Sequence, residues 1–159
     1  IQVLKAIVDA QLEYARVHRQ GSGLLEYAQK FRSSPGKKDG LYWPAKEGEP
    51  QSPLGPLAAQ ASREGYKGEN QPYHGYRFRI LKKQGKDAPG GAYDYVVKGR
   101  MIGGFAVVAY PAAYANSGVM TFLVNQDGVV YQRDLGKGTA EAAAKITSFN
   151  PGTGWSKAN

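Results

Sequence analysis

The segment from Gly118 to Gly136, GVMTFLVNQDGVVYQRDLG, constrains the fold of this chain more than any other stretch. Two apolar runs, VMTFLVN and VVYQRDL, flank the tripeptide Gln126-Asp127-Gly128. An Asp-Gly pair accepts the positive φ angles of a tight turn, so we expect the two runs to pair as an antiparallel hairpin. The hairpin carries no obvious catalytic group, and we interpret it as scaffold of a sheet.

A second strand is predicted upstream, in YRFRILKK. Tyr76, Phe78 and Ile80 alternate there with Arg77 and Arg79, which is the pattern of a half-buried strand. Alternation predicts that the apolar side chains face the core and that both arginines turn outward on one face.

Two more strands are expected between this strand and the hairpin. The run GGFAVVAYP is apolar on both faces, which indicates a central strand that ends at Pro111. The run AYDYVVKG is expected to form a short strand.

The start of the chain, IQVLKAIVDAQLEYARVHRQG, has the pattern of a long amphipathic helix. Apolar residues recur there three or four positions apart and share one face: Val3, Ile7, Ala10, Tyr14 and Val17. Gly21 and Gly23 are expected to end the helix.

Three shorter helices are also predicted. They lie in LLEYAQKF (24–31), around Leu54, Leu57, Ala58 and Ala61, and in TAEAAAKITSF, where Thr139 is the expected N-cap. The rest of the first 70 residues is rich in glycine and proline and reads as loop.

This order of elements predicts one α+β domain over residues 1–159. A helical and loop-rich part (1–70) precedes an antiparallel meander sheet (71–136), and a C-terminal helix and tail (137–159) follow. We expect the first helix to pack on a sheet of about four strands.

The net charge is +8, and cations gather in the middle of the chain, at Arg77, Arg79, Lys82, Lys83 and Lys86. One interpretation is an ordinary solvated basic face. The other is a surface for an anionic polymer: nucleic acid, acidic polysaccharide or lipid headgroups. No apolar run approaches the ~20 residues of a membrane-spanning helix.

Catalytic chemistry is weakly supported by the sequence. The chain has no cysteine, which excludes disulfides, thiol catalysis and thiolate metal sites. Its two histidines are His18, expected at a helix end, and His74, which is either structural or functional. No G-x-S-x-G motif surrounds a serine, and no pair of acids stands out. We therefore predict no catalytic residue, no metal and no organic cofactor.

Tyrosines near cations form the candidate binding site, because aromatic faces interleaved with positive charges can bind sugars, peptides or nucleic acid. The candidate residues are Tyr73, His74, Arg77, Arg79, Tyr93, Tyr95 and Arg100. The alternative is that these rings form core with their hydroxyls at the surface.

Two long segments resemble a known family. GAYDYVVKGRMIGGFAVVAYPAAYANSGVMTFLVNQDGVVYQRDLG and YAQKFRSSPGKKDGLYWP are similar to the bacterial family called domain of unknown function 2950. Precursors in that family resemble exported proteins with a signal peptide, which implies a periplasmic or extracellular location. Relatives often carry an acidic D-x-D-G-D-G run after the first helix, but His18, Gln20 and Ser22 stand here, so a calcium site is not expected.

A weaker resemblance is to the globular heads of type IV pilins and pseudopilins, which also place a helix such as AIVDAQLEYA before a sheet. These observations leave two functions open. One is a non-catalytic envelope or extracellular protein, structural, adhesive or binding, with itself, another envelope protein or an anionic polymer as partner. The other is an envelope hydrolase that acts on cell-wall polymer or peptide through His74 or a carboxylate pair.

Overall fold

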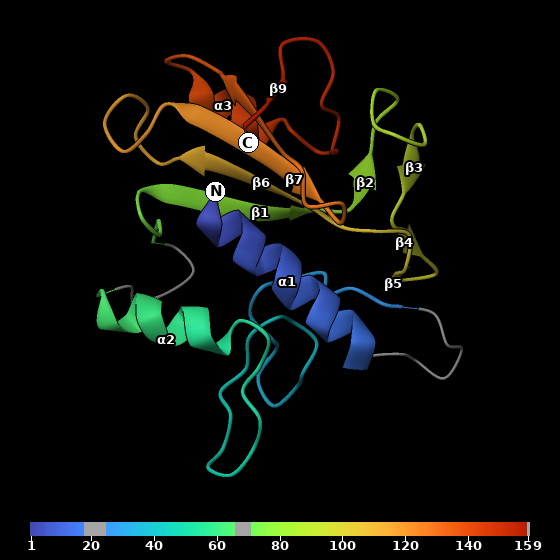
Figure 1. Cartoon of the computed structure of the whole chain (residues 1–159), viewed down its shortest axis with the longest axis vertical. Coiled ribbons are helices and arrows are strands. Elements are labelled where there is room, and N and C mark those ends of the chain that lie inside the picture. The colour runs from blue at the N-terminus through green and yellow to red at the C-terminus, as the bar shows by residue number, and fades with distance from the viewer. Residues whose placement is uncertain (18–24, 66–70, 159) are drawn as a thin grey trace.

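The structure, a computed structural model, describes residues 1–17, 25–65 and 71–158. It is an α+β arrangement of one five-stranded antiparallel sheet with helices on both faces (Figure 1). The helices are α1 (Gln2–Val17), α2 (Gly55–Arg63) and α3 (Thr139–Ala144). The main sheet has the order β1 (Tyr76–Leu81), β6 (Ala106–Pro111), β7 (Met120–Asn125), β8 (Val130–Asp134) and β9 (Ser156–Lys157). Two small two-stranded sheets pair β2 (Lys83–Gln84) with β3 (Tyr93–Asp94) and β4 (Val96–Val97) with β5 (Arg100–Met101).

The predicted hairpin is confirmed as β7 and β8. Met120 lies opposite Asp134 and Val124 lies opposite Val130, and Gly128 takes a φ of 78° in the turn between them. The predicted central strand is confirmed as β6, which lies between β1 and β7 and is buried at five of its six positions. The strand predicted at 76–80 is confirmed as β1, and it forms one edge of the sheet.

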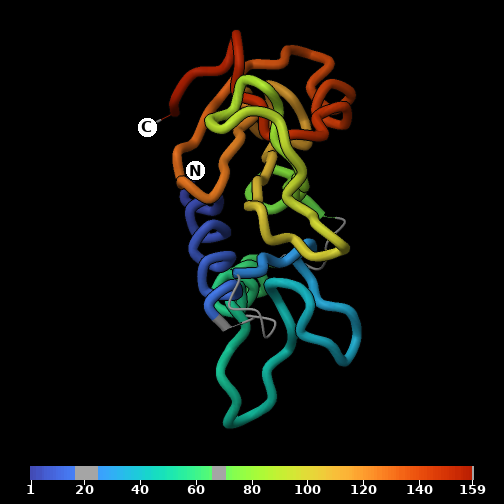
Figure 2. The backbone as a smooth tube through the Cα atoms, turned by 90° about the vertical axis from the view of Figure 1, so that its right-hand side faces the viewer, coloured from blue at the N-terminus to red at the C-terminus, as the bar shows by residue number. Residues whose placement is uncertain are grey.

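The two faces of the sheet are covered by different helices. Leu4, Ile7 and Val8 of α1 are buried in the core that α1 shares with the sheet. Figures 1 and 2 show α1 and α3 on opposite sides of this sheet. The predicted packing of the first helix on the sheet is therefore confirmed.

The helix predicted over 24–31 is wrong for its described part. Residues 25–31 contain no helix, and the N–H of Tyr27 donates to the carbonyl of Met101 at 2.8 Å. The side chain of Gln11, buried in α1, donates to the carbonyl of Ala28 and accepts from its N–H, both at 2.8 Å. Because these partners satisfy the backbone of Ala28 from outside, the segment needs no helical hydrogen bonds of its own.

Smaller predictions also need correction. The main sheet has five strands rather than about four, because the tail contributes β9 beside β8. Thr139 is the first residue of α3 and not its N-cap, which is Gly138. The buried hydroxyl of Thr139 donates to the carbonyl of Gly136.

The run AYDYVVKG forms two short strands, β3 and β4. His18 and the predicted glycine stop at 21 and 23 lie outside the described residues. In the part of the chain described, no helix is long and apolar enough to cross a membrane.

Candidate binding groove along strand β1

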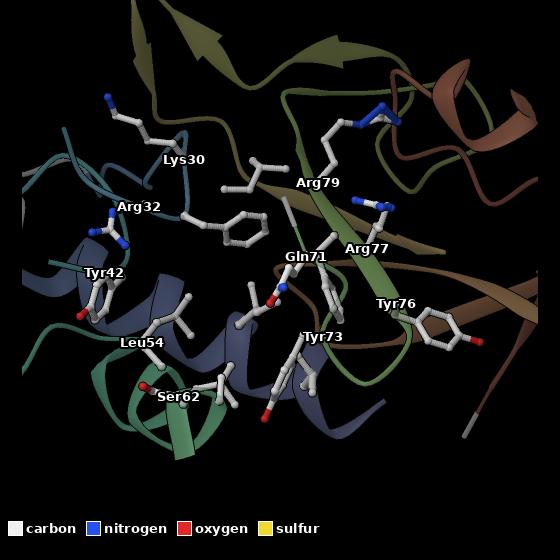
Figure 3. A pocket seen from close by; sticks show the side chains of 18 of the residues that line it. Lys30, Arg32, Tyr42, Leu54, Ser62, Gln71, Tyr73, Tyr76, Arg77 and Arg79 are labelled. Atoms are coloured by element: carbon white, nitrogen blue, oxygen red, sulfur yellow. The ribbon is translucent and has the colours of Figure 1, made fainter. Parts of the chain in front are cut away.

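A groove of about 810 Å³ lies between strand β1, helices α1 and α2, and residues 29–32 (Figure 3). Its apolar wall combines side chains from α1, from the segment 29–32 and from the region of α2: Val3, Ile7, Phe31, Leu54 and Leu57. Phe78 and Ile80 of β1 line the other side. The groove is therefore assembled from parts that are far apart in the sequence.

The wall formed by 29–42 is held by backbone pairing. The N–H of Tyr42 donates to the carbonyl of Phe31 at 2.7 Å, and the N–H of Ser33 donates to the carbonyl of Tyr42 at 2.8 Å. A Cβ on Gly40 would lie 2.8 Å from the carbonyl carbon of Arg32, so a side chain there would push the two segments apart. Glycine at this position is what allows the wall to close.

Asp39 fixes the turn of the same segment. Its carboxylate accepts from the N–H of Ser34 at 2.8 Å and forms an ion pair with Lys30 at 3.0 Å. The backbone hydrogen bond from Ser34 and then the contact with Lys30 hold the pKa of Asp39 well below its usual range. The carboxylate therefore stays ionised, and it partly neutralises Lys30 at the groove.

The groove is positively charged. Four cations line it, Lys30 and Arg32 on one side and Arg77 and Arg79 on β1, and its described lining contains no Asp or Glu (Figure 3). The Arg32 guanidinium lies 5.6 Å from the ring centre of Tyr42, which is a cation–π arrangement. Lys30, Arg32 and Arg77 are exposed, and Lys30 is partly neutralised by Asp39. Arg32 and Arg77 are therefore the cations that we consider for contact with a negatively charged ligand.

Arg79 corrects one prediction. It lies on the same face of β1 as Arg77, but it is half-buried rather than solvated. Its Nη2 donates to the carbonyls of Ala143 and Ile146, at 2.7 Å and 2.6 Å, where α3 ends. A cation is favoured at this point because the last carbonyls of a helix carry partial negative charge. Alternation predicts which face a side chain takes, but not which element packs on that face.

Tyr73 lines one end of the groove, and His74, the next residue, lies outside its lining, in a smaller pocket beside Glu64. His74 Nε2 is 2.8 Å from Glu64 Oε2, and both side chains are exposed. The pKa of Glu64 is lowered by a hydrogen bond from Gln60 and by His74. The pKa of Tyr73 is raised by burial and by the charge of Glu64. His74 takes a φ of 51° in the turn before β1, so it has a conformational role beside its ion pair.

Tyr93, Tyr95 and Arg100 lie outside the groove lining, on the small sheets. The ring of Tyr95 is fully buried, its hydroxyl donates to Gln84 at 3.0 Å, and burial raises its pKa. Arg100 is 3.0 Å from Glu26 in an ion pair. Tyr93 is exposed and packs edge-on against Tyr95. Tyr95 is therefore a core residue, as the alternative interpretation of the tyrosines predicted, and not part of the binding site.

Sequence reasoning missed the residues that complete the groove from the loop-rich part: Lys30, Phe31, Arg32 and Tyr42. One signal was present. In QKFR (29–32) exposed cations alternate with the half-buried Phe31, which is a period of two. The apolar residues of 24–31 also fit a helix, and that interpretation hid the alternation.

No metal-binding cluster of three or more His, Asp or Glu side chains occurs among residues 1–17, 25–65 and 71–158. This observation concerns those residues alone. The absence of bound metal stays a prediction.

The family model described as "Protein of unknown function (DUF2950)" matches residues 1–158. The chain belongs to the DUF2950 family. Comparison with curated proteins and with solved structures gave no match. The resemblance noted from the sequence is thus confirmed for DUF2950, and the function of this DUF2950 chain has to be argued from its own groove.

Proposed function

We propose that this DUF2950 chain is a non-catalytic binding protein of the cell envelope or extracellular space, which holds an extended, negatively charged ligand in the β1 groove. One observation carries this proposal: the described lining has four cations and no carboxylate. The volume of about 810 Å³ is within the range of ligand sites, roughly 300–1,000 Å³. The envelope location is supported by the resemblance to exported precursors.

The shape of the groove favours an extended ligand. Lys30 and Arg32 lie across the groove from β1, and the side chains of Arg77 and Arg79 extend from the far side of β1 (Figure 3). Apolar side chains line the space between β1 and residues 29–32. Each exposed ion pair contributes only ~0.2–1 kcal/mol. Apolar contact adds about 25 cal/mol for each Å² of surface removed from water. A ligand that runs along the groove gains both contributions, whereas a compact anion at one cation gains little.

The test compares two double variants with the same change of net charge. Arg32→Gln/Arg77→Gln removes two of the three exposed groove cations and leaves Lys30, which pairs with Asp39. Lys82→Gln/Lys83→Gln removes two exposed cations outside the lining. Two lost pairs of ~0.2–1 kcal/mol each correspond to roughly 2- to 30-fold weaker binding of an anionic polymer. Retention on an immobilised polyanion should fall for the groove pair more than for the control pair. Equal elution of both variants would mean that net charge, not the groove, sets the binding.

Salt provides a second readout of the same proposal. The screening length falls from about 10 Å at 0.1 M salt to about 3 Å at 1 M, so binding by the parent should weaken steeply across this range. The groove variant should show a shallower salt dependence, because it has fewer cations to screen. A parent affinity independent of salt would contradict the charge argument.

The hydrolase alternative has one observation in its favour, the His74–Glu64 pair at 2.8 Å beside the groove. Such a pair could orient a general base. The test is turnover of cell-wall polymer or peptide by the parent and by His74→Gln. Loss of a measured turnover in His74→Gln, with binding retained, would favour the hydrolase over the binding protein. Pilin-head-like assembly through the long helix and the sheet stays a prediction.

A further inference from the structure

Strand β1 exposes part of its backbone to the groove. It pairs with β6 on one side only, and on the other side Tyr76 exchanges both backbone hydrogen bonds with Tyr73, at 2.8 Å and 3.0 Å. In an antiparallel strand, the N–H and C=O groups of successive residues point to alternate edges. The backbone groups of Phe78 and Ile80 therefore point away from β6, toward the groove that both residues line.

Two neighbouring hydrogen bonds confirm this alternation. On the β6 side, the N–H of Ala112 donates to the carbonyl of Gly75 at 2.8 Å. On the outer side, the carbonyl of Lys82 accepts from the N–H of Tyr95 at 2.9 Å. Between Tyr76 and Lys82, no residue of the described chain hydrogen-bonds to the outward N–H and C=O groups of Phe78 and Ile80.

An open strand edge is a template for pairing with another chain, and proteins usually cover, twist or charge such edges. Here the open edge forms one wall of a groove. We propose that the ligand in the β1 groove is an extended polypeptide segment that pairs antiparallel with Phe78 and Ile80, as a further strand of the main sheet. This inference rests on the proposed binding function and names its ligand class.

The backbone spacing favours a polypeptide over a polysaccharide. Two donors and two acceptors repeat along β1 with the period of two residues, about 6.8 Å at ~3.4 Å per residue. A second peptide strand has the same repeat and the same alternation of donors and acceptors. A sugar chain has no such ladder of alternating N–H and C=O groups.

The side chains of β1 predict a sequence pattern for the ligand. Residues directly opposite each other in neighbouring strands share a face of the sheet. Ligand residues opposite Phe78 and Ile80 would meet the apolar wall, to which Val3 and Ile7 contribute. Those opposite Arg77 and Arg79 would meet cations, and Arg77 is the more exposed of the two, so an acid opposite Arg77 can reach its cation from solvent. We therefore expect a segment of alternating apolar and acidic residues.

The first test uses a labelled seven-residue peptide, Val-Glu-Val-Glu-Val-Glu-Val with blocked ends, and fluorescence anisotropy. In the proposed register the valine amides face β1 and the glutamate amides face away. N-methylation of the valine amides should weaken binding at least tenfold, and N-methylation of the glutamate amides should change it less than threefold. A peptide of the same composition with the residues grouped should bind at least tenfold more weakly than the alternating one. Equal binding of both methylated peptides would overturn strand addition.

The second test changes the protein. Ile80→Pro removes an outward N–H without removing a hydrogen bond to β6, which is the position where an edge strand tolerates proline. Ile80→Ala is the control, because it also loses the apolar side chain but keeps the N–H. The alternating peptide should bind Ile80→Pro at least tenfold more weakly than Ile80→Ala. Equal affinity of the two variants would overturn the proposal, and the methylated peptides give the answer if Ile80→Pro does not fold.

Polygalacturonate serves as the acidic polysaccharide probe. If it binds the parent and loses affinity in Arg32→Gln/Arg77→Gln, while the alternating peptide does not bind, the binding function stands and the polypeptide inference fails. If neither probe binds, both proposals fail. Peptide binding that depends on the valine amides and on the groove cations supports both.

Discussion

Arg79 is predicted to stabilise the fold, whereas Arg77 on the same face of β1 is not. Replacing Arg79 with Met keeps much of the aliphatic stem but removes the donors to the carbonyls of Ala143 and Ile146, at 2.7 Å and 2.6 Å. Hydrogen bonds from a charged donor contribute ~1.5–3 kcal/mol each. Because Arg79 is half-buried, solvent screens part of this, and we expect a loss of about 1–3 kcal/mol in total.

The assay is urea and thermal denaturation of the two single variants. A chain of 159 residues loses roughly 2–4 °C in Tm for each kcal/mol, so Arg79→Met should melt about 2–12 °C lower than the parent. Arg77→Met is the control, because Arg77 is exposed, and its free energy of unfolding should change by about 0.5 kcal/mol or less. Equal loss in both variants, or no loss in Arg79→Met, would refute the assignment of Arg79 to the end of α3.

Three further predictions concern packing, pH and assembly. Gly118→Ala should lower the free energy of unfolding, measured by urea denaturation, by about 1–3 kcal/mol, because its Cβ would lie 2.5 Å from the hydroxyl oxygen of Tyr76. Gly138→Ala is the control, because a Cβ there meets no heavy atom within 4 Å, and it should lower the free energy of unfolding by about 0.5 kcal/mol. The lowered pKa of Asp39 means that its stabilisation of the groove wall is complete above the ordinary carboxyl pKa, near ~4, and is lost as pH falls from there to the lowered pKa of the folded state. The backbone amide shift of residue 34 should change at that lower pH, well below ~4, and Asp39→Asn should abolish the pH step. Self-association, if it occurs through the open edge of β1, should make the mass measured by light scattering rise with concentration in the parent and not in Ile80→Pro, and a rise in both would point to another surface.

The elements predicted from sequence are those whose signal is local. The Asp127-Gly128 turn, the alternation along β1 and the apolar run of β6 each follow from the conformational preferences of a few adjacent residues, and the structure contains all three. The long amphipathic stripe of α1 belongs to the same class. Such signals indicate the element and the face it buries.

The parts that could not be predicted depend on contacts between distant segments. Residues 25–31 are not helical, because the side chain of Gln11, 17 positions before Ala28, hydrogen-bonds to the backbone N–H and C=O of Ala28. Arg79 is bonded because a helix more than 60 positions later ends beside it. The groove likewise joins residues near 30, 54 and 78, and no local pattern shows that they meet.

The most direct test of the binding account is amide hydrogen exchange at single-residue resolution, with and without the alternating valine–glutamate peptide. The account predicts that Phe78 and Ile80 exchange quickly in the free protein, because their N–H groups point away from β6, and at least tenfold more slowly in the complex. Arg77 and Arg79, whose N–H groups face β6, should be protected in both states. Unchanged exchange at Phe78 and Ile80 in the presence of saturating peptide would contradict the account.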